Sequence, residues 1–334
     1  MSIDASRLTV ILQGRLKDGP VDIAARAIES VRQHLPGAQI ILSTTDDCTA
    51  VSFDGVQCVA DASAVHFADA SGNINNVNKL ISTVANGLAL ATREYSLKLR
   101  TDHVLCSNAL LALMGDEQPA SLLGARIGVS NLFLRNPIKL CYLFHLSDTL
   151  QFGRTDDLRR LWNIGPLPAE FVYLAGGPRI NPIGTFQGYT SFRLLPEQAI
   201  LLRFLQTCGQ ALDLDHISHT RFDLFCAWED LLLDNFEVHD WQSLGVTPPQ
   251  RFLTEPYAPE TILTGADLHS LRARRTKRHK AGRYLHLLLN KYLLCWFRRR
   301  WLVSVSSLLL FSFSPRMAIA ARTAYRRFCE AGRT

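Results

Sequence analysis

Short apolar runs alternate with segments of helical periodicity in the first hundred residues, and this order constrains the fold more than any other feature. The runs of strand length lie at residues 8–12, 39–43, 56–59 and 95–99. Apolar residues recur at helical spacing over 21–35 and again over 80–90. Alternating strands and helices are typical of a mostly parallel open α/β sheet with helices on both faces, which is the fold class that we expect.

Polar residues gather where the expected strands end. The segments 13–15, 44–47 and 100–103 each follow an apolar run. The carboxyl ends of parallel strands meet at one edge of a sheet, so these segments would line one crevice, where open α/β sheets bind their ligands. An ordinary role stays open for each of them, because polar side chains at strand ends also cap turns and following helices.

The usual nucleotide-binding fingerprints are missing from the sequence. No Gly-rich dinucleotide loop follows the first strand and no Walker A sequence is present, while Gly176-Gly177-Pro178 is typical of a turn. Dehydrogenase and P-loop classes are therefore disfavoured. A sheet that binds nucleotide without such a loop, and carries an acid after a mid-domain strand, is compatible with a sugar-nucleotide transferase. In such enzymes that acid usually holds a divalent cation.

One longer segment carries a family resemblance. An Asn-rich helix start and a strand that ends in a charged tripeptide, NINNVNKLISTVANGL…YSLKLRTD, resemble the core of the WavE-type lipopolysaccharide synthesis proteins of Gram-negative bacteria. Further pieces match in the same order, among them FHLSD at 144–148 and LPEQ at 195–198, so that the resemblance spans roughly Leu8 to Val246. The family is regarded as glycosyltransferase-like with a GT-A-like fold. The resemblance therefore implies a transferase that takes a sugar from a nucleotide donor.

The resemblance also implies a donor site. The residues expected to bind the nucleotide sugar are Gln13, Gly14, Arg15, Thr44, Thr45, Asp46, Asn75, Asn76, Asn78, Arg100 and Asp102. GT-A enzymes commonly carry Asp-x-Asp after the mid-domain strand to hold Mn²⁺ or Mg²⁺. Here the tripeptide begins with Arg100, so Asp102 is the expected metal ligand while Arg100 could pair with the diphosphate itself, and metal dependence stays open. An ion pair of Arg100 with Asp102 or Glu94 is the ordinary alternative.

Transfer with inversion needs a carboxylate that takes the proton of the acceptor hydroxyl. The sequence offers three candidates for this catalytic base: Asp148, Glu197 and Glu229. Asp148 lies in an expected loop before an aromatic-glycine pair. Glu197 starts an expected helix, where capping or the helix dipole would explain it equally well. Glu229 lies on an expected helix, where a solvated face would explain it.

The C-terminal part of the chain differs in charge from the rest. From Arg272 onward there are 16 Lys and Arg against one acid, Glu330, which leaves 20 basic and 29 acidic residues before it. Two apolar segments follow the basic block and are each too short to span a bilayer. We therefore expect a transferase domain over 1–260 and a basic, apolar, helical tail over 261–334 that lies on an anionic membrane surface through 272–327. Two alternatives are less favoured: the basic block could bind nucleic acid, or the two apolar segments could form a hairpin buried in the protein.

Cysteine usage and the N-terminus indicate a compartment. The 8 cysteines are scattered without Cys-x-x-Cys spacing, as in a protein kept in a reducing environment. The first residues lack the features of a secretory signal. We expect a cytoplasmic protein, peripheral on the cytoplasmic face of the inner membrane, that transfers a sugar from a nucleotide-sugar donor to a lipid-linked or oligosaccharide acceptor such as lipopolysaccharide. A non-catalytic envelope assembly or scaffold protein with a degenerate transferase domain is the alternative.

Overall fold

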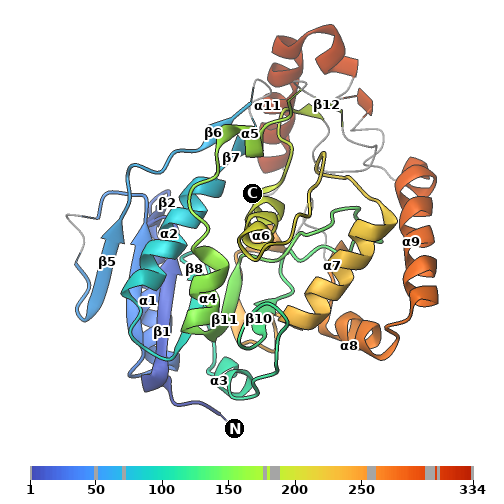
Figure 1. Cartoon of the computed structure of the whole chain (residues 1–334). Helices are drawn as coiled ribbons and strands as arrows, with labels where there is room; N and C mark the ends of the chain where they lie inside the picture. Colours follow the sequence, from blue (N-terminus) through green and yellow to red (C-terminus); the bar gives the residue numbers. More distant parts are fainter. Residues whose placement is uncertain are drawn as a thin grey trace.

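A seven-stranded sheet runs through the computed structural model. The structure describes residues 2–48, 52–69, 73–175, 179–180, 189–253, 261–297, 305–306 and 309–331 (Figure 1). Across the sheet the strands follow the order β5 (Val56–Ala60), β4 (Gln39–Thr44), β1 (Leu8–Gln13), β8 (Tyr95–Arg100), β11 (Leu150–Arg154), β10 (Ile127–Ser130) and β14 (Phe236–His239). β11 runs antiparallel to both of its neighbours, and the remaining neighbours pair in parallel. The predicted mostly parallel open sheet is confirmed.

The order of the strands reverses at β1. The chain passes outward from β1 to β4 and β5, and then returns to form β8 on the other side of β1. In the β1–β8 pair, Leu8 is level with Tyr95 and Gln13 is level with Arg100. The carboxyl ends of β1 and β8 therefore lie side by side at a topological switch point, the place where open α/β sheets bind ligands.

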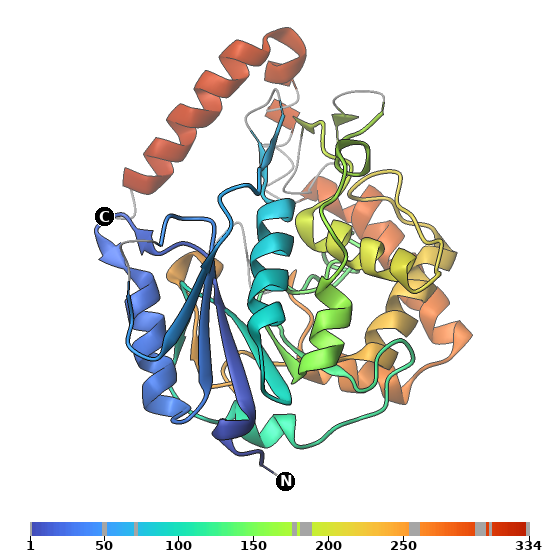
Figure 2. The same cartoon turned by 60° about the vertical axis from the view of Figure 1, so that its left-hand side comes forward.

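Helices cover both faces of the sheet, as predicted (Figure 2). α1 (Ile23–His34) packs on the face that carries Val10 and Leu12. The opposite face, which carries Ile11, is covered by α2 (Val77–Leu90), α4 (Thr155–Trp162) and α6 (Pro196–Thr207). α2 approaches the sheet so closely that a Cβ on Gly87 would lie 2.4 Å from Ile11 Cγ2. A glycine at this position lets the helix and the sheet meet.

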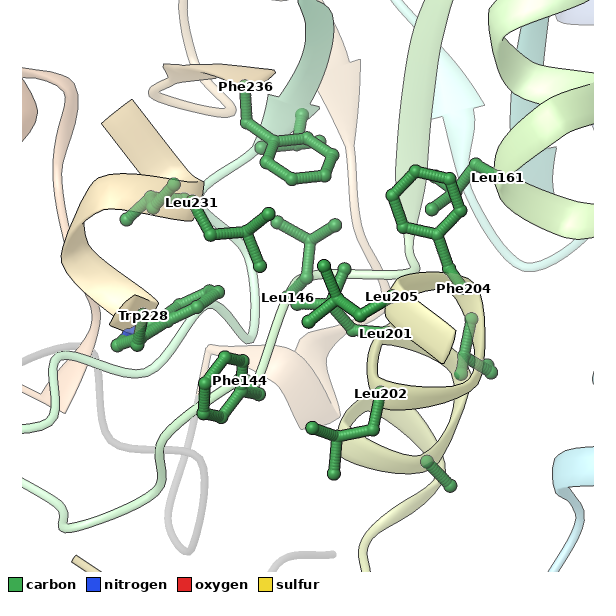
Figure 3. Packing of buried hydrophobic residues seen from close by; sticks show 14 of the residues in the cluster. Phe144, Leu146, Leu161, Leu201, Leu202, Phe204, Leu205, Trp228, Leu231 and Phe236 are labelled. Atoms are coloured by element: carbon green, nitrogen blue, oxygen red, sulfur yellow. The ribbon is translucent and has the colours of Figure 1, made fainter. Parts of the chain in front are cut away.

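The larger core lies where α6 and α7 (Phe222–Asn235) pack beside the sheet (Figure 3). The rings of Phe144 and Trp228 lie 5.7 Å apart between their centroids, and Leu201 and Phe204 of α6 belong to the same cluster. Full burial of one such side chain contributes about 1.5–3 kcal/mol. This packing fixes α6, and with it the first-turn residue Glu197, against the sheet.

The remaining elements of the body are short. They are η1 (Ala5–Arg7), β2 (Lys17–Asp18), β3 (Val21–Asp22), β6 (Phe67–Ala68), β7 (Ile74–Asn75), β9 (Val104–Leu105), α3 (Leu110–Met114), α5 (Ala169–Val172), β12 (Arg179–Ile180), β13 (Tyr189–Thr190), β15 (Val246–Thr247) and η2 (Gln250–Phe252). Several of them follow the carboxyl ends of the sheet strands, and Arg251 of η2 contacts Asp102 after β8.

The C-terminal part is helical, as predicted. It contains α8 (Gly265–Ala273), α9 (Lys277–Tyr292), η4 (Leu294–Phe297) and α11 (Pro315–Ala331). The domain boundary predicted at residue 260 lies outside the described residues, as does the turn predicted at 176–178. Among the helices of the described ranges, none combines the length and the hydropathy needed to cross a bilayer.

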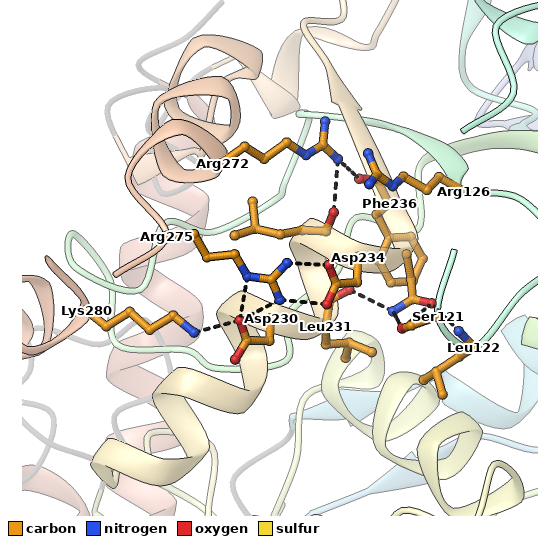
Figure 4. Close-up of polar contacts among 12 residues, drawn as sticks. Ser121, Leu122, Arg126, Asp230, Leu231, Asp234, Phe236, Arg272, Arg275 and Lys280 are labelled. Carbon is orange, nitrogen blue, oxygen red and sulfur yellow. Dashed lines mark hydrogen bonds and ion pairs between the residues drawn. The ribbon is translucent and has the colours of Figure 1, made fainter. Parts of the chain in front are cut away.

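Acidic side chains of α7 bind the start of the basic C-terminal segment (Figure 4). Arg275 and Lys280 donate to Asp230 at 2.7 and 2.6 Å. Arg283 donates to Glu229 at 2.7 Å, and the Glu229 side chain is 4% exposed. A solvated face for Glu229, one of the sequence alternatives, is therefore wrong. Part of the positive charge expected on a free tail is neutralised within the protein.

Replacing Glu229 by alanine would leave the largely buried Arg283 guanidinium without its carboxylate. We expect the free energy of unfolding to fall by about 3 kcal/mol. Asp234→Ala is the matched control on the same helix, because Asp234 pairs with Arg275 while 31% exposed, and its loss should cost less than about 1 kcal/mol. Urea denaturation followed by circular dichroism measures both variants. Equal losses would contradict a buried structural ion pair at Glu229.

Candidate functional site

The candidate site begins at the adjoining carboxyl ends of β1 and β8. The N–H of Thr101 donates to the carbonyl of Gln13 at 3.0 Å, and that of Gly14 donates to the carbonyl of Ser43 at 3.2 Å. Gly14 has a φ of +146°, and a Cβ there would lie 2.5 Å from Thr101 Oγ1. The close approach of the strand ends therefore requires a glycine. Beside it, Gln13 Oε1 is buried and accepts no hydrogen bond from the described residues.

Asp102, two residues after β8, accepts four hydrogen bonds. Arg100 donates from Nε to Oδ1 at 3.1 Å and from Nη2 to Oδ2 at 2.9 Å. His103 Nδ1 lies 2.7 Å from Oδ1, and Arg251 of η2 donates to Oδ2. Burial alone would raise the pKa of the Asp102 carboxyl, but the bonds from His103 and Arg100 hold it well below its usual range. Asp102 is thus an anion that fixes two guanidinium groups.

An aromatic ring supports both arginines. The centroid of the Phe252 ring lies 5.4 Å from the guanidinium carbon of Arg100 and 5.3 Å from that of Arg251. Phe133 meets Phe252 edge-on, with centroids 5.7 Å apart. Phe133 has a φ of +66°, an unfavourable conformation for a residue with a large side chain, which the surrounding contacts must maintain. The two arginine side chains keep 31% and 47% exposure, so both stay accessible.

Lys98 lies two residues before Arg100 and so points to the same face of β8. Its side chain is fully buried, yet its ammonium group has partners: it donates to the carbonyl oxygen of Asp148 and lies 3.8 Å from the Asp148 carboxylate. The ring of Trp162 lies 5.6 Å away. Burial lowers the pKa of Lys98 to about 8, and the Asp148 carboxylate opposes that shift.

Glu197, at the start of α6, lies on a small cavity together with Asp148. The cavity has a volume of about 10 Å³ and is also lined by Gln151 and Trp162, which is roughly the room of one water molecule. Burial and the nearby Asp148 raise the pKa of Glu197 to about 8, so this carboxyl is mostly protonated at neutral pH. His145 Nε2 lies 3.6 Å from Glu197 Oε2 and is neutral, because burial lowers the pKa of His145 to about 3.

These side chains act on one another electrostatically, and we call them the strand-end charge cluster: Lys98, Arg100, Asp102, Asp148, Glu197 and Arg251. Within the cluster, Asp102 fits poorly as a metal ligand. Both of its oxygens already accept hydrogen bonds from positively charged or N–H donors, and a cation would have to displace two arginines. In the described part of the chain, no three His, Cys, Asp or Glu side chains gather as a metal site. The predicted metal role of Asp102 stays a prediction, and the arrangement favours an anion instead.

Part of the predicted donor set lies at this edge of the sheet. Gln13, Gly14, Arg100 and Asp102 meet at the switch point. At the end of β4, the Asp46 carboxylate accepts the N–H of Leu16 at 2.8 Å, while its own N–H donates to Thr44 Oγ1 at 2.9 Å. Asp46 thereby ties the loop after β1 to the end of β4. Arg15 is exposed and Thr45 is half-buried in the same two loops.

The predicted asparagines are used mainly by the fold. Asn75 donates to the carbonyl of Leu194 at 3.3 Å. Asn78 donates to the carbonyl of Leu167 at 3.0 Å and accepts its N–H at 2.8 Å. These bonds secure two distant loops to the start of α2. Asn76 is exposed as the N-cap of that helix, without a side-chain capping bond.

The candidate bases separate into two groups. Asp148 and Glu197 lie together in the cluster, whereas the Glu229 carboxylate is bound by Arg283 in the α7–α9 contact. Sequence reasoning missed Lys98 and Arg251. The signal for Lys98 was present, because a lysine between two leucines of a buried strand needs a partner. Arg251 carried no such signal, because 149 residues separate it from Asp102.

Fold and site together define an α/β protein with charged residues converging on the topological switch point of its sheet. The family model of WavE lipopolysaccharide synthesis matches residues 8–300, and the chain belongs to this family. A comparison with curated proteins gives no significant match. One similar solved structure is 4-diphosphocytidyl-2C-methyl-D-erythritol synthase from Anaerococcus prevotii, with 10% sequence identity, a TM-score of 0.29, and coverage of 47% of this chain and 73% of that chain.

The raised pKa of Glu197 makes stability depend on pH in a defined direction. Between the ordinary glutamate pKa of 4.5 and the folded pKa of about 8, the unfolded chain is ionised at this residue while the folded chain keeps the proton. Stability of the native chain therefore falls as pH rises, by at most about 1.4 kcal/mol per pH unit from this group. Glu197→Gln cannot ionise, so its stability relative to the native chain should increase from about pH 5 to about pH 8 and then level off. Urea denaturation across this range measures the difference, and a difference independent of pH would contradict the raised pKa.

Proposed function

We propose that this chain is a glycosyltransferase of lipopolysaccharide synthesis that takes a sugar from a nucleotide-sugar donor. Membership of the WavE family supports a role in lipopolysaccharide synthesis. The observation that carries the finer assignment is the pair of guanidinium groups, Arg100 and Arg251, which Asp102 holds at the switch point between β1 and β8. Two fixed positive charges at this edge match the diphosphate of a nucleotide sugar.

In the proposed complex the arginines bind the diphosphate with the nitrogens that Asp102 leaves unused. Asp102 takes Nε and Nη2 of Arg100, so Nη1 is available to a phosphate oxygen. Gln13 lies level with Arg100 on β1 and has a buried Oε1 without a partner among the described residues. We assign this oxygen to a donor group of the nucleotide base or ribose, whose N–H or O–H would satisfy it.

The arginines would also act on the reaction itself. As the acceptor hydroxyl oxygen bonds to the anomeric carbon of the sugar, the bond from that carbon to the diphosphate breaks, and its electron pair stays on the diphosphate. Arginines beside the diphosphate stabilise this developing charge without reorganising, because Asp102 and Phe252 hold them in place. A preorganised donor of this kind lowers the barrier by roughly 3 kcal/mol.

The proton of the acceptor hydroxyl needs a base, and the pair Asp148 and Glu197 is our candidate. Both line the same small cavity beside Lys98. A pKa of about 8 for Glu197 lies close to the operating pH, which suits a group that exchanges a proton. Glu229 has no part in this proposal because Arg283 binds its carboxylate.

A non-catalytic envelope assembly protein with a degenerate transferase domain is the second candidate. One observation favours it: the cavity between Asp148 and Glu197, about 10 Å³, is too small for a sugar ring in the described arrangement. A transferase would have to open this region when its acceptor binds, whereas an assembly protein would not. Assays of binding and of transfer separate the two functions.

Isothermal titration calorimetry with a panel of nucleoside diphosphates and nucleotide sugars tests the donor site. We expect at least one of them to bind, with an affinity that EDTA leaves unchanged. Arg100→Ala and Arg251→Ala should each weaken binding by about tenfold or more, the cost of one charged hydrogen-bonding partner. Arg221→Ala is the matched control, because it removes an exposed arginine that pairs with Asp223 at the start of α7. The donor site would be refuted if none of the panel bound, or if all three variants bound equally well.

Asp148→Asn and Glu197→Gln test the chemistry separately from donor binding. We expect each variant to keep its donor affinity and to lose about a hundredfold or more in transfer of radiolabelled sugar to lipopolysaccharide, because the acceptor proton loses its carboxylate. Surface glycan in cells that carry only the variant chain gives an independent readout. Normal glycan with both variants would favour the assembly protein.

A further inference from the structure

The C-terminal half of α9 carries leucines on its outward face, where a helix of a water-exposed surface is normally polar. Inward, Lys280 pairs with Asp230 of α7 (Figure 4). Arg283 pairs with Glu229 of the same helix, and Leu287 is fully buried. Outward, Leu285 and Leu289 are 58% and 43% exposed. The helix therefore uses Lys280 and Arg283 for packing and presents Leu285 and Leu289 to the surroundings.

The apolar exposure continues beyond α9. The exposed large apolar side chains of this region are Leu285, Leu289, Tyr292, Leu293, Leu294, Phe297, Leu309, Leu310, Phe313 and Met317. Phe297 and Phe313 reach 83% and 88% exposure. In the rest of the described chain, exposed large apolar residues number only four: Val21, Val65, Ile74 and Leu90. Their concentration in one segment of the chain is typical of an interaction site, and we call these ten side chains the apolar C-terminal surface.

Exposed cations precede and accompany the residues of the apolar C-terminal surface along the chain. Arg274, Lys277 and Arg278 precede them and are exposed, and Arg316 directly precedes Met317 in the sequence. None of these four forms an ion pair with a described residue, in contrast to the α7-bound cations of the same basic block. Within the described part of the basic C-terminal segment, these four exposed cations are therefore available to an anionic partner.

We propose that the apolar C-terminal surface docks on an anionic membrane. Its leucines and aromatic rings would enter the boundary between headgroups and acyl chains, while Arg274, Lys277, Arg278 and Arg316 meet lipid phosphates. A second copy of this chain fits less well, because a two-fold contact would bring cations against cations. The surface lies outside the strand-end charge cluster, so this proposal does not depend on the proposed transfer reaction.

Flotation of the full-length chain with vesicles tests the proposal. We expect binding to phosphatidylcholine vesicles that contain phosphatidylglycerol, weaker binding at high salt, and little binding to phosphatidylcholine alone. Leu285→Ser/Leu289→Ser should bind about tenfold or more weakly because less apolar surface is buried. Lys277→Glu/Arg278→Glu should weaken binding to the anionic vesicles by about fivefold or more for each residue. Val21→Ser/Leu90→Ser, which removes apolar side chains that are 42% and 37% exposed elsewhere, should bind like the native chain.

Three results would overturn the proposal. They are a native chain that does not bind anionic vesicles, a leucine variant that binds as well as the native chain, and native self-association in light scattering that the leucine variant abolishes without any vesicle binding. The last result would assign the surface to a second copy of the chain. Thermal melts of the variants check folding, and the charge variant, which leaves the leucines in place, keeps the test decisive if the leucine variant unfolds.

Discussion

The carboxylate of Asp102 is the interaction on which the rest of the candidate site depends. It joins Arg100, at the end of a central strand, to Arg251, which comes from η2 after the last strand of the sheet. Two guanidinium groups over one ring would repel each other, and a largely buried anion between them offsets that repulsion because the local dielectric is low. The same contact anchors η2 over the carboxyl ends of β1 and β8. Phe252 also packs against Phe133 and His103, so the ring and the ion pairs together hold the accessible charge at the switch point.

A second group of charged side chains, Lys98, Asp148 and Glu197, is buried on the same face of β8. Lys98 is fully buried, and a buried ammonium group requires a nearby anion, which Asp148 supplies at 3.8 Å. A second ionised carboxylate in the same small cavity would exceed what one lysine can offset. Burial of Glu197, together with the nearby Asp148 carboxylate, raises the pKa of Glu197 to about 8, so the proton stays on this residue at neutral pH. Glu197 and Asp148 lie on the same small cavity, the geometry on which their proposed role in proton transfer depends.

The sheet was predictable because its signals are local: continuous apolar runs, helical spacing between them, and polar residues at strand ends. The convergence of Gln13, Gly14, Arg100 and Asp102 followed from the geometry of parallel strands alone. Arg251 was not predictable, since no local pattern tells which distant arginine meets Asp102. The roles of Asn75 and Asn78 were not predictable, because a side-chain amide can bind a ligand or a backbone carbonyl equally well. Only the fold brings the carbonyls of Leu194 and Leu167 within reach of these amides. For Glu229, helical spacing could not separate a solvated face from a face covered by α9. The sequence shows the net positive charge of the C-terminal segment directly. It does not show which cations pair with the acids of α7 and which stay available to a partner.

A crystal structure of the chain with a bound nucleoside diphosphate is the most direct test of the central claim, that Asp102 holds two arginines for a diphosphate. The account predicts phosphate oxygens within hydrogen-bonding distance of both Arg100 and Arg251, with Asp102 still bound to the two guanidinium groups. A divalent cation coordinated by Asp102 with both arginines turned away, or a nucleotide bound elsewhere on the protein, would contradict it.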